Sequence, residues 1–75
     1  MYDVDDINDA LVESILDDVS SALLEKGYNP VNQIVGYLIT GDSSYITNYK
    51  KARELILSID KEKILESIVR RYLKN

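Results

Sequence analysis

Apolar residues recur at steps of three and four along most of the chain, a spacing that places them on one face of an α-helix. The longest such pattern runs from Val4 to Leu23 and predicts a first helix over residues 5–26. Acidic side chains near its beginning and Gly27 after Lys26 are typical of a helix start and a helix end. The first third of the chain is therefore expected to be one amphipathic helix.

A second helix is predicted over residues 30–40. Asn29 is suited to cap its first turn, and Pro30 has the backbone angle of a first helical position. The apolar positions are spaced at i, i+3, i+4, i+7 and i+8, and they are Val31, Ile34, Val35, Leu38 and Ile39. Gly36 lies inside this helix, where glycine costs about 1 kcal/mol relative to alanine. We expect another helix to cross closely at Gly36.

The second half of the chain contains three more helical patterns. Asp42 and the two serines after it signal a cap for a short helical turn at 43–47, followed by a helix at 48–58. Asp60 is placed to cap a last helix at 60–73. No segment alternates apolar and polar residues over any length, as a strand would. The prediction is an all-α fold, a compact bundle of four to five helices forming a single helical domain over residues 1–75.

Charge is distributed unevenly along the chain. The 75 residues include 13 acidic and 9 basic side chains, with a net charge of −4, yet all nine bases lie after residue 25. The acidic first helix is therefore suited to lie against the basic last two helices, of its own chain or of a neighbour. A domain of this length buries only roughly 60% of its unfolded surface. A second copy would cover the remaining apolar area, and we predict an intertwined homodimer.

The residues most used in catalysis and metal binding are missing, since the chain has no Cys and no His. The three glycines match neither a phosphate-binding loop nor a dinucleotide fingerprint. We therefore predict a protein without enzymatic activity, metal or cofactor. The longest apolar run, residues 34–39, is far below the roughly 20 residues that cross a bilayer, and no signal peptide pattern begins the chain. We expect a cytoplasmic protein that does not enter the membrane.

Basic side chains in the last two helices are the candidates for binding. For Arg53 and Arg70 two roles are open, a buried ion pair or contact with a partner protein. The basic set could also contact phosphates, so a small nucleic-acid-binding helical module over residues 48–58 and 60–73 is the alternative function. The acidic first helix would repel a polyanion, which makes nucleic acid the less favoured partner.

The stretch from Lys26 to Leu38, followed by Gly41-Asp42 and Tyr45-Ile46, resembles the IreB family of small bacterial regulatory proteins, called ReoM in some members. The similarity continues through Tyr49, Ala52-Arg53 and residues 64–73, and is looser in the first helix. The positions that carry the family motif, to which we assign structural roles, are Gly27, Tyr28, Asn29, Pro30, Asn32, Gln33, Gly36, Gly41 and Asp42.

This resemblance implies an all-helical cytoplasmic homodimer that is not an enzyme and acts by binding proteins. Family members are substrates of a membrane Ser/Thr kinase that senses the cell wall. They control cell-envelope synthesis through proteolysis of an early peptidoglycan enzyme. The implied partners are a second copy and an unidentified protein of the protease-adaptor or envelope-regulation machinery.

Several positions depart from the family pattern. The family switch is phosphorylation of a threonine ahead of the first helix, but the only threonines here, Thr40 and Thr47, do not match it. We therefore expect no phosphosite of the family type. The family usually has arginine at three positions that are occupied here by Asn48, Leu57 and Lys61. Arg53 matches the family and Arg70 keeps a base, so these two are the candidate partner-binding residues.

Overall fold

The computed structural model describes the backbone of residues 4–74 and the side chains of residues 7–74. The described residues form four α-helices and two short 3-10 turns, and they contain no strand, so the all-α prediction is confirmed. The elements in chain order are α1 (Val4–Glu25), α2 (Pro30–Thr40), η1 (Ser43–Tyr45), η2 (Tyr49–Lys51), α3 (Ala52–Leu57) and α4 (Lys61–Lys74).

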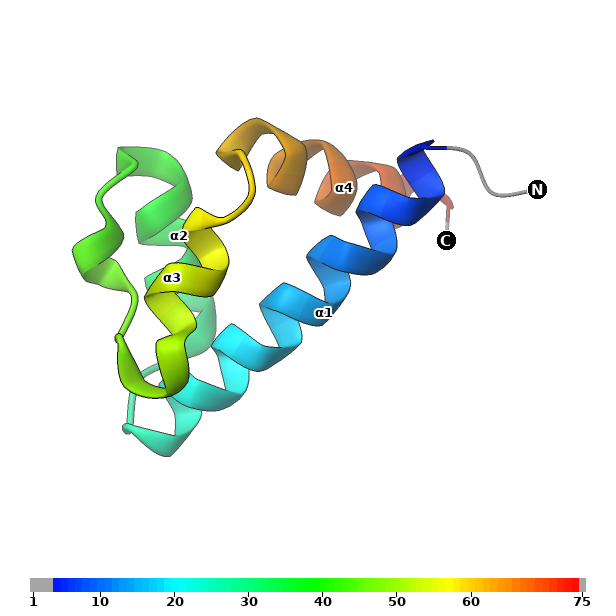
Figure 1. Ribbon diagram of the computed structural model, residues 1–75. Helices are drawn as coiled ribbons and strands as arrows, with labels where there is room; N and C mark the ends of the chain where they lie inside the picture. The colour runs from blue at the N-terminus through cyan, green and yellow to red at the C-terminus, as the bar shows by residue number, and fades with distance from the viewer. Residues whose placement is uncertain (1–3, 75) are drawn as a thin grey trace.

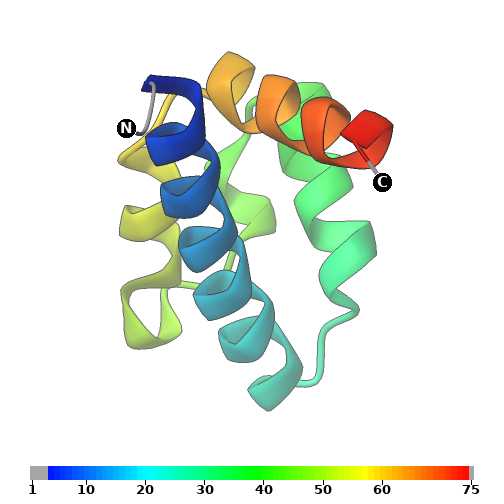
Figure 2. The same ribbon diagram turned by 90° about the vertical axis from the view of Figure 1, so that its right-hand side faces the viewer.

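The long helix α1 organises the molecule. The helices α2 and α3 lie beside its C-terminal half, and α4 crosses its N-terminal half (Figure 1). Seen along the perpendicular direction, α3 lies on one side of α1 and α2 on the other, with α4 across the top (Figure 2). The two helices meet through Asp9 and Glu13 of α1 and Arg70 and Arg71 of α4.

The core is one cluster of buried apolar side chains, half of which come from the face of α1 that periodicity predicts. Its members are Val12, Ile15, Val19, Ala22, Leu23, Tyr37, Ile46, Ala52, Ile56 and Ile64. In α2 the buried residue is Tyr37, whereas Val31, Val35 and Ile39 of the predicted apolar set are exposed. The helix α2 is thus rotated so that only part of its apolar face meets the core.

The ends of α2 are formed by the capping residues that the sequence indicates. The Asn29 side chain accepts a hydrogen bond from the backbone N–H of Asn32 at 3.1 Å, and Pro30 is the first helical residue. Gly41 has a left-handed backbone with φ of 74°, and its N–H donates to the Tyr37 carbonyl at 2.7 Å. These local interactions explain why the helix spans the predicted residues 30–40.

The predicted helix at 48–58 is shorter than expected. Its regular part begins only at Ala52, because Lys50 and Lys51 have left-handed φ angles of 53° and 61°. The chain turns there so that half-buried Tyr49 packs against the core and Lys50 reaches Glu25 of α1 at 3.0 Å. The turn predicted at 43–47 is also shorter, and it spans Ser43–Tyr45.

The two outer helices differ from their predicted limits by a single residue at each end. The first ends at Glu25, where residue 26 was expected, and the last occupies 61–74 in place of 60–73. Helix ends fray by this amount, so these differences leave the arrangement unchanged.

A close approach at Gly36 is present, but the neighbour is the side chain of Tyr45, and among the described residues no α-helix crosses there. A methyl group on Gly36 would lie 2.5 Å from two ring carbons of Tyr45. The Gln33 side chain donates to the Tyr45 carbonyl at 3.0 Å and holds the same segment. The glycine therefore makes room for the aromatic ring of η1, which corrects the expectation of a helix crossing.

Candidate interaction site

An ion pair between Asp9 and Arg70 joins α1 to α4. The Asp9 side chain is 9% exposed and that of Arg70 is 28% exposed. Arg70 donates from Nε to Oδ2 of Asp9 and from Nη2 to Oδ1, both at 3.0 Å. Such a two-point contact between guanidinium and carboxylate fixes direction as well as distance. The pair therefore sets how α4 lies across α1.

The same contact controls the protonation of Asp9. Hydrogen bonding from Arg70 lowers the pKa of this carboxyl below its ordinary value of 3.8, while burial acts in the opposite direction. Ser67 of α4, whose hydroxyl is buried, also lowers this pKa. Asp9 is thus held as a carboxylate beside α4.

Further ion pairs connect the acidic helix to the basic segments. Arg71 lies 2.9 Å from Glu13 on the exposed side of the junction between α1 and α4, and Lys50 pairs with Glu25 at the other end of α1. The opposite charges in the two parts of the sequence therefore meet within one chain.

Arg53 is bound to the backbone of its own chain. Its Nε donates to the carbonyl oxygens of Ser43 at 3.2 Å and Ile46 at 3.0 Å. Ser43 begins η1 and Ile46 directly follows it, so the half-buried Arg53 side chain holds this turn against α3. Its positive charge also contributes to a lowered pKa of Asp42, although the main cause there is the hydrogen bond from the Ser44 backbone. Of the two roles open for each arginine, Arg70 forms an ion pair within its own chain, whereas Arg53 is bound to backbone carbonyls, a role that the sequence did not suggest.

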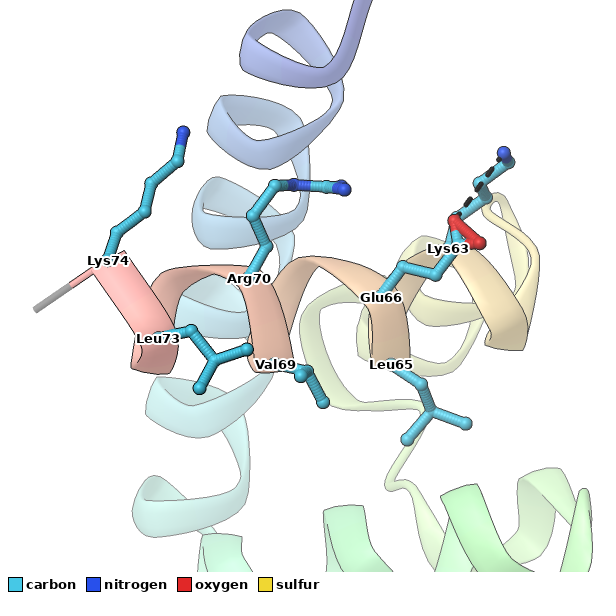
Figure 3. A pocket seen from close by; sticks show the side chains of 7 residues that line it. All are labelled: Lys63, Leu65, Glu66, Val69, Arg70, Leu73 and Lys74. Carbon is cyan, nitrogen blue, oxygen red and sulfur yellow. Dashed lines mark ion pairs between the residues drawn. The ribbon is translucent and has the colours of Figure 1, made fainter.

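The side of α4 that faces away from the core is apolar as well. Leu65, Val69 and Leu73 project from it on one side of an open depression, and Arg70 and Lys74 extend to the other side (Figure 3). Tyr72 is 80% exposed and Leu73 is 74% exposed. The only residues of α4 that are buried are Ile64 and Ser67. Most of the apolar surface of this helix therefore remains uncovered by the described part of its own chain.

Most residues of the motif at 27–42 shape the backbone around α2. Gly27 has a φ of 83°, a left-handed conformation that ends the segment after α1. Asp42 accepts a hydrogen bond from the Ser44 N–H at 2.9 Å and begins η1. With the roles of Asn29, Pro30, Gln33, Gly36 and Gly41 described above, these positions define the path from α1 to η1. The Tyr28 side chain is about half exposed, and its backbone N–H donates to the Leu23 carbonyl at 2.9 Å, which closes the turn after α1.

A model of the protein family described as the IreB regulatory phosphoprotein matches residues 1–74. The protein belongs to the IreB family. The match includes α1, where the sequence resemblance is looser, so membership of the IreB family extends over the whole helical arrangement. As a member of the IreB family, the protein is assigned to a class of regulatory proteins.

In this IreB family member, the hydroxyls of both threonines form local hydrogen bonds. The Thr40 hydroxyl donates to the Gly36 carbonyl at 2.7 Å and accepts from the Asp42 N–H at 3.0 Å. The Thr47 hydroxyl accepts from the Tyr49 N–H at 3.2 Å. Both side chains therefore belong to turns that shape the chain.

Among the described residues, no three acidic side chains come close enough to hold a metal ion. None of the described helices has the length and hydropathy needed to cross a membrane.

Sequence reasoning identified Arg53 and Arg70 but missed Asp9 and the outer face of α4. Asp9 is one of several acids in the first helix, and its partner lies 61 residues away, so no local pattern distinguishes it. The outer face could have been found, because apolar residues in the last helix occupy more than one side of the helical circumference.

Proposed function

We propose that this IreB family protein is a non-catalytic cytoplasmic regulator that controls cell-envelope synthesis, the supply of peptidoglycan, by binding other proteins. The observation that carries this proposal is the family match over residues 1–74. The arrangement of the site supports it, because the most prominent exposed feature is an apolar helix face with a charged edge. Such a surface suits a protein partner, since interfaces combine an apolar centre with arginine and a polar rim.

The protein is proposed to act as a homodimer and to bind one further partner, a component of the protease-adaptor or envelope-regulation machinery. Arg53 and Arg70 are proposed to form part of the partner surface. Both are partly accessible, and each holds a neighbouring segment in position through its contacts within the chain. No observation favours the alternative of a nucleic-acid-binding module, because Lys50 and Arg71 lie beside acidic residues whose charge would repel phosphates.

Regulation is proposed to proceed without the threonine switch of the family. Thr40 and Thr47 are embedded in turns, where a phosphate would break hydrogen bonds that shape the backbone. The input to this protein would therefore differ from that of relatives that are modified at a threonine ahead of the first helix.

Affinity capture from the native cytoplasm tests the proposal. The bait is the full chain, compared with Arg53→Ala, Arg70→Ala and the control Lys63→Ala, which removes an exposed base from the same helix α4. Helix content of each variant is checked by circular dichroism. We expect one protein to be retained by the wild type and by Lys63→Ala, and to be lost from both arginine variants.

Two results would contradict the proposal. The first is a set of captured proteins that is the same for all four baits, together with an unchanged abundance of envelope enzymes when the gene for this protein is deleted. The second is phosphate on Thr40 or Thr47 after incubation with the wall-sensing kinase, measured by intact mass, which would restore a threonine switch to this chain.

A further inference from the structure

An open depression with a volume of about 270 Å³ lies between α1 and α4. Two carboxylates that line it, Glu13 and Asp17, are four residues apart and therefore share one face of α1. Arg71 pairs with Glu13 at 2.9 Å, whereas no ion pair among the described residues includes Asp17. Ile68 contributes to the apolar wall. Ser67 lines the same depression, and its buried hydroxyl has no hydrogen-bond partner in the described chain.

A second depression, of about 290 Å³, lies on the side of α1 that faces α3, and it repeats this arrangement. Asp18 and Glu25 line it about two helical turns apart. Lys50 pairs with Glu25 at 3.0 Å, whereas Asp18 is in no ion pair with the described residues. Ala22 and Leu55 provide apolar surface. Each depression thus combines two carboxylates, one base and an apolar wall, and each lacks one positive charge.

The contacts of the described chain do not account for these two aspartates. A helix favours acidic side chains in its first turn, but Asp17 and Asp18 lie beyond the middle of α1. Like charges one turn apart, such as Glu13 and Asp17, repel each other. The bases that reach α1 from the later helices and turns are paired with its other acids. The missing positive charges are therefore expected to come from another molecule.

We propose that the middle of α1 binds a basic segment of a partner protein, with one long basic side chain in each depression. Lysine and arginine fit these surroundings, because their aliphatic stems pack on apolar walls while their charged ends reach a carboxylate. The Ser67 hydroxyl offers the basic group a further acceptor. Asp17 and Asp18 project about 100° apart, so the segment needs two basic residues to reach both. This proposal rests on the proposed function as a protein-binding regulator and assigns the chemistry of one partner.

Fluorescence anisotropy of the full chain measures the binding. The probes are short fluorescent peptides with two arginines at different spacings, and the reference peptide has glutamine in place of each arginine. We expect an arginine peptide to bind, with an affinity that falls as salt is added, and the reference not to bind. Asp17→Asn and Asp18→Asn should each weaken binding about two- to fivefold, because each removes one exposed ion pair. The double variant should weaken it about four- to 25-fold.

Two controls separate a built site from attraction by net charge. Glu62→Gln removes an exposed acid of α4 that lines neither depression, and it should change the affinity less than twofold. Ile68→Thr keeps every charge but removes part of the apolar wall, and it should weaken binding about two- to fivefold. A peptide whose basic groups lack the aliphatic stem should bind as weakly as the reference.

The stability of the double variant distinguishes a role in binding from a role in the fold. Because Asp17 and Asp18 carry surplus negative charge, we expect Asp17→Asn with Asp18→Asn to melt at the wild-type temperature or above it. Circular dichroism provides this measurement on the samples used for binding. Weaker binding together with an unchanged or higher Tm supports the proposal. A clearly lower Tm would show that the aspartates serve the fold and would overturn it.

Three further results would overturn the basic-segment site. These are an equal loss of affinity in Glu62→Gln and the aspartate variants, undiminished binding by the double variant, and peptide-induced dissociation of a homodimer in sedimentation. The last result would assign this face of α1 to a second copy. None of them removes a partner that is captured through Arg53 and Arg70, so the proposed function would stand. Peptide binding without any captured partner would contradict the proposed function alone.

Discussion

Gly36 and Tyr45 show how one missing side chain determines the position of a neighbouring turn. The tyrosine ring occupies the space where a Cβ of residue 36 would be, and Gln33 fixes the same turn through its hydrogen bond to the Tyr45 carbonyl. Glycine is unfavourable inside a helix, so its presence in α2 is explained by this contact.

We expect Gly36→Ala to lower the free energy of unfolding by about 1 kcal/mol. Overpacking costs typically 1–3 kcal/mol, and the ring of Tyr45 is partly exposed, so it can tilt outward at the lower end of this range. Higher helix propensity offsets part of the loss. In a Tyr45→Ala background the clash is gone, and the same substitution should stabilise by about 0.5–1 kcal/mol. Urea denaturation of the four proteins measures both effects. An equal effect of Gly36→Ala in both backgrounds would show that the ring does not cause it.

At the scale of elements, α4 is fastened to α1 mainly by polar contacts. It buries one large apolar side chain, Ile64, together with Ser67, and its C-terminal half is tied down by Arg70 and Arg71. Apolar packing changes little with pH, whereas a carboxylate contact depends on protonation. The attachment of α4 should therefore be sensitive to acid.

Acid should weaken the protein through Asp9. Its pKa is lower in the folded than in the unfolded chain, so the stabilisation is fully present above the ordinary value of 3.8 and is lost as the pH falls through the lower folded value. We expect Asp9→Asn to lower Tm at pH 7 by about 5 °C or more, because Arg70 is left facing a neutral group. The decline of Tm below about pH 4 should also become shallower in this variant.

The matched control for this prediction is Glu13→Gln, which removes the exposed pair between the same two helices. Exposed pairs contribute about 0.2–1 kcal/mol, so Tm at pH 7 should change little. Thermal melts followed by circular dichroism between pH 7 and pH 2 provide the measurement. An Asp9→Asn protein with the wild-type acid profile would rule out this carboxyl as the sensitive group.

The sequence predicts where a helix begins and ends when those ends depend on residues next to them in the chain. The caps at Asn29 and Gly41 lie beside the helix that they limit, and α2 could be placed from them. The late start of α3 could not be predicted, because the left-handed turn before it depends on Tyr49 and Lys50 meeting the end of α1. Arg70 could be identified as a candidate, but its partner Asp9 depends on how distant helices cross.

At the scale of the whole molecule, one continuous core joins all four helices. Ile56 of α3 is fully buried within it, whereas Ile39 of α2 is 76% exposed. The two isoleucines therefore provide a comparison in which the residue type is the same and only the surroundings differ.

We expect Ile56→Ala to lower the free energy of unfolding by about 2–5 kcal/mol, since it leaves a cavity in the core. Ile39→Ala should change it by no more than about 0.5 kcal/mol, as is usual for exposed positions. Chemical denaturation at a concentration that keeps the oligomeric state constant compares the two. A large loss on Ile39→Ala would show that the outer face of α2 is covered in solution.

The left-handed residues Lys50 and Lys51 bear on how far selection has optimised this protein. A left-handed backbone costs roughly 1–2 kcal/mol for a residue with a side chain, and two such residues stand in succession here. A small domain has a net stability of about 5–15 kcal/mol in total, so these two left-handed residues lower the free energy of unfolding by a considerable fraction. Glycine would adopt the same backbone without that cost. The natural sequence is therefore less stable than its own fold permits, as expected of a protein that is maintained above a threshold of stability and is not driven to a maximum.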